Sequence, residues 1–353
     1  MARTVVRAAA LILLVALGGC ASVGPPTLPR DRLAYVSALS ESWKQQMLLN
    51  LVRLRYGDVP VFLDVTSIIN AYSLESEVNG AAQYAPPGRG DTFLGFGGSA
   101  RYAERPTISY VPLMGDKFAK GIMAPIPVPA ILLLVESGYQ ADVVLRFALN
   151  AINGMANANA GASTRAGDPR FLELIGLLRE EQAAGGLGFE AKQEGSRSRT
   201  LMLLREPLDA AMAERHRRIR ELLGLQPGLR EYDVAFGSFP GGGTEVAILS
   251  RSILQVMLDV ASRIEAPPGE DAQGILPPPT EVAGARLPPS VRVRSGLERP
   301  GDAFVSVQYR GHWFWIADGE YRSKAAFSFL MLLFSLTETS TAQTAPVVTV
   351  PAR

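Results

Sequence analysis

The sequence is poor in cysteine and histidine, and this scarcity limits the chemistry that the protein can perform. Cys20 is the only cysteine among 353 residues, so the chain cannot form an internal disulfide. The two histidines, His216 and His312, are far apart in the sequence. Zinc sites draw on Cys and His ligands, and most activated nucleophiles need a neighbouring base such as His. We therefore expect no metal site, no cofactor and no catalytic residues.

A surplus of charge and the short motifs of common enzymes are also missing. The 35 Lys and Arg residues nearly balance the 34 Asp and Glu residues, so no basic excess attracts nucleic acid. The sequence contains no Gly-x-Ser-x-Gly, no His-Glu-x-x-His, no EF-hand loop and no complete Walker sequence. The glycines at 241–243 lack the Gly-Lys-Ser/Thr ending of a phosphate loop, and we interpret them as a turn. These absences argue against an enzyme and against a nucleic acid partner.

Long hydrophobic runs are absent too. The N-terminal apolar run follows Arg3 and Arg7 and holds about a dozen residues, whereas a spanning helix needs about 20. A basic start, a short apolar run and small residues before a cleavage site are typical of a secretory signal. The apolar residues 325–336 form a run of similar length, which predicts a buried core helix.

The N-terminal run ends in Leu17-Gly18-Gly19-Cys20, which resembles the lipobox of bacterial lipoprotein precursors. The resemblance implies that residues 1–19 are a signal peptide and that Cys20 carries acyl chains such as palmitate, which anchor the protein in a membrane of the cell envelope. Several acyl chains give stable anchoring, which one chain alone does not. Ala21 stands where an aspartate favours inner-membrane retention in that family, so the resemblance favours the periplasmic face of the outer membrane. An ordinary signal peptide or a short anchor helix with a chance cysteine is the alternative.

Proline, glycine and hydrophobic periodicity divide the mature chain. Small and proline-rich residues at 20–35 predict a tether, and residues 36–265 predict the main body. The Pro/Gly-rich text at 266–290 predicts an extended or exposed linker. Residues 291–337 predict a β-hairpin and an apolar helix that dock on the body, and 338–353 predict a flexible tail.

The body alternates between helical and strand periodicity, which predicts an α+β fold with antiparallel hairpins and several packed helices. A short soluble hairpin is expected at 187–204, and a flexible loop at 155–167. Helices are expected at about 36–56, 116–123, 129–138, 140–153, 168–182, 208–225 and 251–265.

A long β-hairpin at about 70–104 is the most unusual predicted element. Apolar and polar residues alternate on both sides of the turn text at 85–91. The residues that this alternation places on the apolar faces, where they are candidates for membrane or partner contact, are Tyr72, Leu74, Val78, Tyr84, Leu94, Phe96 and Tyr102.

Two accounts of this hairpin belong to different functional classes. In the favoured account, the hairpin is a soluble sheet covered by helices, because Ser76 and Gly80 interrupt its apolar face. In the other account, the hairpin enters lipid, where a strand needs about 9–11 alternating residues with aromatic residues near its ends. Tyr72 and Tyr84 provide such ends. A single hairpin leaves backbone groups unpaired in lipid, so this account requires a ring of subunits whose strands close one sheet.

Few other residues are candidates for a site. His312, Trp313 and Trp315 form the most site-like cluster, which either stacks a sugar or peptide or packs a strand against a helix. The neighbouring carboxylates Glu180 and Glu181 and the charged run 214–221 are expected on solvated helix faces.

These observations predict a lipid-anchored cell-envelope protein with a non-catalytic binding or assembly role. Its expected partners are the membrane, through the anchor, and either other envelope proteins or further copies of itself. The alternative is a subunit of an oligomeric outer-membrane pore or export channel that uses the hairpin at 70–104. An envelope hydrolase with an unrecognised site is the weaker alternative.

Overall fold

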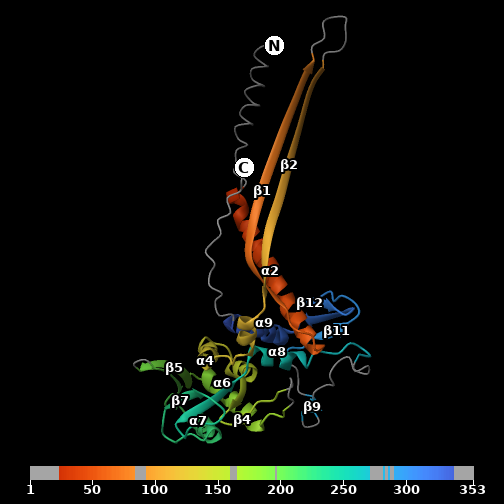
Figure 1. Ribbon diagram of the computed structural model, residues 1–353. Coiled ribbons are helices and arrows are strands. Elements are labelled where there is room, and N and C mark those ends of the chain that lie inside the picture. Colours follow the sequence, from red (N-terminus) through yellow and green to blue (C-terminus); the bar gives the residue numbers. More distant parts are fainter. Residues whose placement is uncertain are drawn as a thin grey trace, which may run out of the picture. The chain divides into compact units, whose positions relative to one another are not determined.

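The protein has an α+β fold with antiparallel hairpins, as the alternating periodicity predicted (Figure 1). The structure is a computed structural model that describes residues 24–83, 93–159, 165–194, 197–270, 281–282, 285–286 and 290–337. The chain divides into two compact units. The first unit contains residues 1–42 and 63–112, and the second contains residues 43–62 and 113–353.

The long hairpin is confirmed, and its strands are longer than predicted. Strands β1 (Phe62–Gln83) and β2 (Phe93–Leu113) contain 22 and 21 residues and form a two-stranded sheet. Strand β1 begins before the predicted hairpin, at Phe62, and β2 continues beyond it to Leu113. Pro106 and Pro112 fit β2 because a strand with an open edge tolerates residues that cannot donate to a ladder. We call β1 and β2 together the ribbon.

Helix α2 (Gly24–Arg55) corrects the prediction of an irregular tether over 20–35. Pro25 and Pro26 occupy its first turn, where a backbone N–H would have no helical partner in any case. Pro29 lies within the helix but close to its start, so it removes few hydrogen bonds. The helix ends before Gly57, whose φ of 75° suits glycine.

A six-stranded sheet forms the centre of the second unit, in the order β4-β3-β8-β7-β6-β5. All neighbours are antiparallel except β7 and β8, which are parallel. The strands are β3 (Leu149–Ile152), β4 (Met155–Ala156), β5 (Leu187–Glu194), β6 (Arg197–Leu204), β7 (Glu231–Phe236) and β8 (Glu245–Ser250). The predicted short hairpin at 187–204 is β5 and β6, paired from Leu187–Leu204 to Glu194–Arg197.

The predicted helix at 140–153 is wrong in its second half. Helix α5 (Ala141–Ala148) ends where β3 begins, and β3 pairs with both β4 and β8. Asn153 and Gly154 have φ values of 44° and 77°, which makes the tight turn into β4. Part of the expected loop at 155–167 is therefore ordered by β4 and by an isolated bridge between Asn159 and Arg165.

Side-chain caps fix the starts of three helices in this unit. Asp168 accepts from the backbone N–H of Arg170 at 2.9 Å at the start of α6. Asp209 accepts from that of Met212 at 2.7 Å at the start of α7, and Ser252 forms a capping box with Gln255 in α8. The helices are α3 (Asp116–Met123), α4 (Val128–Glu136), α6 (Pro169–Ala183), α7 (Ala210–Leu223) and α8 (Ile253–Ala261).

The C-terminal residues share the core of the second unit. Strands β11 (Arg294–Gly296), β13 (His312–Ala317) and β12 (Ala303–Tyr309) form a three-stranded sheet in that order, and β9 (Glu281–Val282) pairs with β10 (Ala285–Arg286). Phe314 and, on α9 (Tyr321–Thr337), Phe327 are fully buried in the same cluster as Leu48 and Val256. Within the segment 266–290, predicted as an extended or exposed linker, Pro267 is buried and Glu270 is partly exposed.

Candidate functional sites

The predicted hairpin residues lie on the ribbon, where their backbone is described. Tyr72, Leu74 and Val78 lie an even number of residues apart on β1. Because alternate positions of a strand share one side, these three positions share one side of β1. Leu94, Phe96 and Tyr102 are arranged in the same way on β2. Tyr84 and Cys20 lie outside the described residues.

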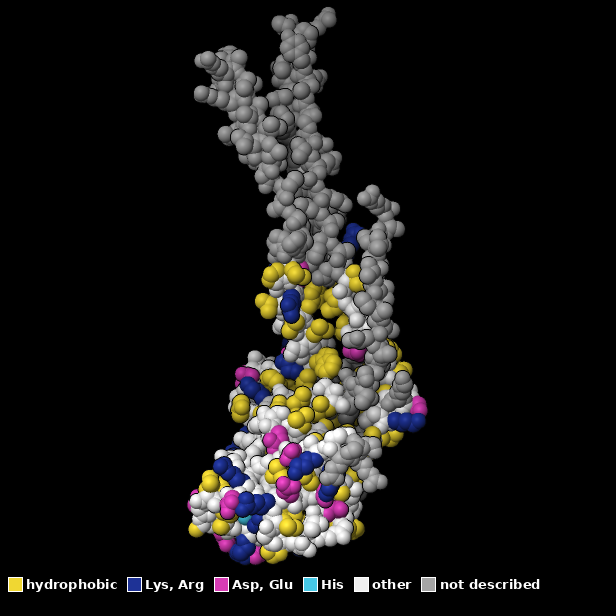
Figure 2. Space-filling model, turned by 90° about the vertical axis from the view of Figure 1, so that its left-hand side faces the viewer, with side chains coloured by type: hydrophobic (Ala, Val, Ile, Leu, Met, Phe, Trp, Pro, Cys, Tyr) yellow, Lys and Arg dark blue, Asp and Glu magenta, His cyan; other side chains and the backbone are white. Residues whose placement is uncertain are grey.

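Exposed apolar side chains gather where the ribbon begins and ends. Tyr110 and Val111 on β2 are 56% and 47% exposed, and Ile69 on β1 is 43% exposed. Other large apolar residues that are exposed in the described part of this unit are Leu28, Leu33, Val36, Leu63 and Ile108. Figure 2 shows such side chains gathered here, whereas charged side chains are interspersed over the second unit. A dense group of exposed apolar residues is typical of an interaction surface.

The ribbon also has open strand edges. Thr66 on β1 donates to the Ser109 carbonyl on β2 at 3.4 Å, so the two strands lie side by side where the ribbon begins and ends. We call this part of the ribbon its root. No third strand pairs with either of them within the described part of the chain. Outer edges of this length carry rows of unpaired N–H and C=O groups, which readily bind strands of another chain. A lone two-stranded sheet is marginally stable in water, which increases this tendency.

The structure does not bring His312, Trp313 and Trp315 together as one cluster. Side chains alternate along β13, so His312 lies on the side of buried Phe314, and both tryptophans lie on the opposite side. The Arg299 guanidinium lies over the Trp313 ring at 5.4 Å, and Trp315 lies against Gly296, where an added Cβ would be 3.3 Å from the indole. The faces needed to stack a ligand are therefore partly occupied.

His312 instead belongs to a polar group around Tyr56. The Tyr56 hydroxyl donates to Glu270, and His312 Nδ1 lies 3.6 Å from the same carboxylate. Burial and then the hydrogen bond to Glu270 raise the pKa of Tyr56 well above its usual value. Tyr309 donates to Asp58 in the same region, and this bond, together with burial, raises the pKa of Tyr309. The contacts of Tyr56 and His312 with Glu270 hold residue 270 to the body, which is a structural role.

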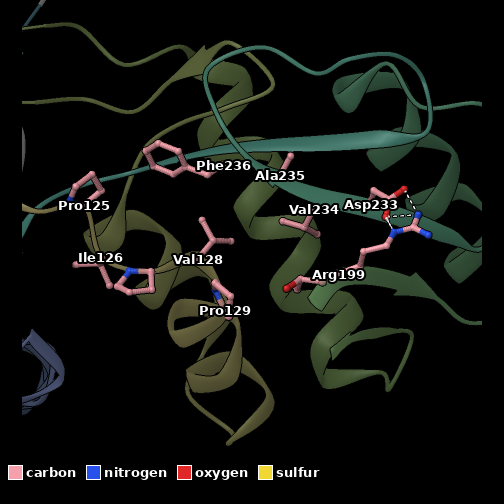
Figure 3. Close-up of a pocket in the computed structure, with 11 residues that line it drawn as sticks. Pro125, Ile126, Val128, Pro129, Arg199, Asp233, Val234, Ala235 and Phe236 are labelled. Atoms are coloured by element: carbon pink, nitrogen blue, oxygen red, sulfur yellow. Dashed lines mark hydrogen bonds and ion pairs between the residues drawn. The ribbon is translucent and has the colours of Figure 1, made fainter. Parts of the chain in front are cut away.

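A pocket of about 580 Å³ lies between the segment 125–129 and the strands β6 and β7 (Figure 3). Apolar residues line most of it, including Ile126, Val128 and Val234. Figure 3 shows the ion pair of Arg199 and Asp233 at one side, with contacts of 2.9 and 2.5 Å. The charges of this pair neutralise each other, and apart from the Thr200 hydroxyl the lining holds no nucleophile and no second acid. The pocket can hold an apolar group, and nothing in its lining points to a reaction.

A buried ionic group joins α6 to α7, and sequence reasoning missed it. Glu181 Oε2 and His216 Nε2 are 2.9 Å apart, and both side chains are fully buried. Arg215 donates to the other Glu181 oxygen. Helical spacing gave a signal, because Leu174, Leu178 and Glu181 follow one another at four and three residues on the buried side. The expected solvated face is therefore wrong for Glu181 and His216.

Within the described ranges, His, Cys, Asp and Glu side chains do not gather in threes as a metal would require. Among the helices that the structure describes, none combines the length and the apolar character needed to cross a bilayer. No protein-family model, curated protein or solved structure matches this chain.

Proposed function

We propose that this protein is a lipid-anchored component of the bacterial cell envelope with a non-catalytic assembly role. The ribbon is the element through which it assembles, and its occupant is the ribbon of another copy of the chain. The observation that carries this proposal is the pair of long strands with open edges and exposed apolar residues at their root. The lipobox at residues 17–20 supports the anchor and the location.

A second copy is the natural occupant because β1 and β2 offer two different open edges. The β1 edge of one copy can pair with the β2 edge of the next, which is a head-to-tail contact. Such contacts close into a ring when the rotation between copies allows it. Every ribbon in a closed ring has both edges paired.

The second candidate is a subunit of an oligomeric outer-membrane pore or export channel. The length of the ribbon favours it, because 22 residues extend roughly 70 Å at the usual rise per residue of a strand. A membrane strand needs only about 9–11 residues. A ring of such ribbons could therefore cross lipid and still project beyond it.

The test is assembly in mild detergent. We expect the purified protein to form a discrete oligomer by light scattering, visible as a ring in negative-stain micrographs. The double variant Ile108→Lys with Val111→Lys places charges at the ribbon root and should yield monomers. Leu208→Lys is the matched control, because Leu208 is 66% exposed in the second unit and its charge should leave assembly intact.

The outcomes separate the candidates. A monomeric wild-type protein with a protease-resistant body contradicts both. A ring that also makes lipid vesicles permeable to small ions supports the pore, and a ring that leaves vesicles sealed supports assembly alone.

The anchor is tested separately by metabolic labelling with palmitate. We expect label in the wild-type protein and none in Cys20→Ala. Equal labelling of both, or label in neither, contradicts the lipoprotein assignment.

A further inference from the structure

Strands β6 and β7 separate before β7 ends, and a pocket lies where they part. The two strands pair as far as Thr200 and Val234, and within the described residues no residue of β6 pairs with Ala235 or Phe236. These residues all line the pocket of about 580 Å³ (Figure 3). The pocket therefore lies beside the end of β7, at the point where β6 no longer pairs with it.

The backbone of Phe236 faces the side that β6 has left. Asp233 and Gly237 donate their backbone N–H groups to the carbonyls of Thr244 and Ile248, along β8, at 3.0 Å each. Since alternate residues of a strand hydrogen-bond to opposite sides, the N–H and C=O of Phe236 point away from β8. Backbone groups without a partner strand at a sheet readily bind an extended chain.

The opposite wall of the pocket does not complete this pairing. Figure 3 shows the segment 125–129 across the pocket from Phe236. Pro125 and Pro127 lack a backbone N–H, and Ile126 between them donates its own to the Arg251 carbonyl at 2.9 Å. The residues 125–127 therefore offer no donor to the backbone of Phe236, and the edge of β7 stays open beside a wall that is already in place.

The side chains of the lining favour an apolar occupant without charge. Ile126 is fully buried and Val128 is 6% exposed, so their wall is preformed, whereas Phe236 is 60% exposed. The charged side chains of the lining are Arg199 and Asp233, which neutralise each other. Charge complementarity therefore selects an occupant that is uncharged where it contacts the pocket. The volume falls within the roughly 300–1,000 Å³ that is usual for ligand pockets.

We propose that this pocket binds a short extended peptide, whose backbone pairs with that of Phe236 and whose apolar side chain packs between Val128 and Val234. Strand addition to an open sheet edge takes its affinity from main-chain hydrogen bonds and its specificity from a side-chain pocket, and both features are present here. A fatty acyl chain fills the apolar space but leaves the Phe236 backbone groups without partners, which is costly once water is excluded. This inference does not depend on the ribbon, on the anchor or on assembly.

The test uses synthetic peptides and the full-length Cys20→Ala protein, so that no attached acyl chain competes. The probes are fluorescein-labelled acetyl-Thr-Val-Thr-Val-Thr-amide and its analogues with Leu or Phe in place of Val, and fluorescence anisotropy measures their binding. We expect saturable binding of at least one probe. Methylating the amide nitrogens of that probe removes its backbone donors and keeps its side chains, and we expect its affinity to fall by about tenfold or more.

Two variants assign the binding to the pocket. Phe236→Ala removes an aromatic ring that lines the pocket and should weaken binding on the order of tenfold. Phe239→Ala is the matched control, because Phe239 is 80% exposed, lies three residues further along the chain and does not line the pocket. Neither ring is buried, so both variants should keep the circular dichroism spectrum of the parent protein.

The proposal is overturned if no probe binds. It is also overturned if Phe236→Ala and Phe239→Ala bind the probe equally well, because the peptide then lies elsewhere, for example on the open edges of the ribbon. A methylated probe that binds as tightly as its parent overturns it too, and displacement of the parent probe by dodecanoate in that case identifies a site for an acyl chain.

Discussion

Glu181 and His216 form a hydrogen-bonded pair with no exposed surface, 2.9 Å between Oε2 and Nε2. The pair connects α6 to α7, and Arg215 on α7 donates to the other oxygen of the same carboxylate. Gly186 follows α6 and approaches so closely that a Cβ there would overlap the Glu181 carboxylate. The contact between the two helices therefore depends on one buried acid and on one residue without a side chain.

Removing the Glu181 carboxylate should strongly destabilise the second unit. In Glu181→Ala, Arg215 and buried His216 lose their common acceptor, and breaking such a pair reduces the free energy of unfolding by about 3–5 kcal/mol. Urea unfolding followed by circular dichroism measures this loss of unfolding free energy. Glu180→Ala is the control, because the Glu180 side chain is 64% exposed and lies 4.0 Å from Arg215. Its effect should stay within about 0.5 kcal/mol, and equal losses in the two variants would contradict the role of the buried pair.

The two glycines near this contact should respond oppositely to alanine. Gly186→Ala forces the new methyl group against Glu181, which should reduce the free energy of unfolding by about 1–3 kcal/mol. Gly176 lies within α6, and its added Cβ would meet no atom within 4 Å. Gly176→Ala should therefore stabilise the protein by about 0.5–1 kcal/mol through helix propensity. Thermal unfolding of both variants checks the direction of each change in stability. A Gly186→Ala variant as stable as the wild-type protein would contradict the close contact between residue 186 and the Glu181 carboxylate.

Local signals were sufficient for the elements that the sequence predicts correctly. Asp168-Pro169 predicts the start of α6 because an N-cap and a first-turn proline act within a few residues. The ribbon follows from alternation, which is also local. The prediction of a helix at 149–152 is wrong because the apolar residues there fit a helix as well as a strand, and it is the pairing with β8 that makes this segment a strand.

The sites were harder to predict, because they depend on contacts between distant segments. The alternation of side chains along a strand is enough to predict that His312 faces away from both tryptophans of β13, since adjacent residues of a strand face opposite ways. The Glu181 pair gave a partial signal, in the helical spacing from Leu178.

The ion pair at the start of α6 should make stability depend on pH in the acidic range. The hydrogen bond from Arg170 holds the pKa of Asp168 below its usual value. The stabilisation is therefore present above the unfolded pKa of about 3.9 and is lost as the pH falls through the lower folded value. Asp168→Asn keeps a capping oxygen but loses the charge, so it should be less stable at pH 7 by up to about 1 kcal/mol. Urea unfolding should show this difference disappear near pH 2, and a difference that persists there would exclude the ion pair as its cause.

Tyr56 should make stability depend on pH at the alkaline end. Burial and the hydrogen bond to Glu270 raise the pKa of Tyr56, so the folded protein retains a proton that the unfolded chain loses near pH 10. This contribution is complete below pH 10 and decreases as the pH rises above it. Tyr56→Phe removes the bond and should lower the free energy of unfolding at pH 8 by about 1.5–3 kcal/mol. Between pH 10 and 11 the gap to the wild-type protein should narrow by about 1 kcal/mol. Tyr321→Phe, at a residue 77% exposed, is the control and should follow the wild-type curve throughout. A gap between Tyr56→Phe and wild type that stays constant from pH 8 to 11 would show that the Tyr56 proton is not held by the fold.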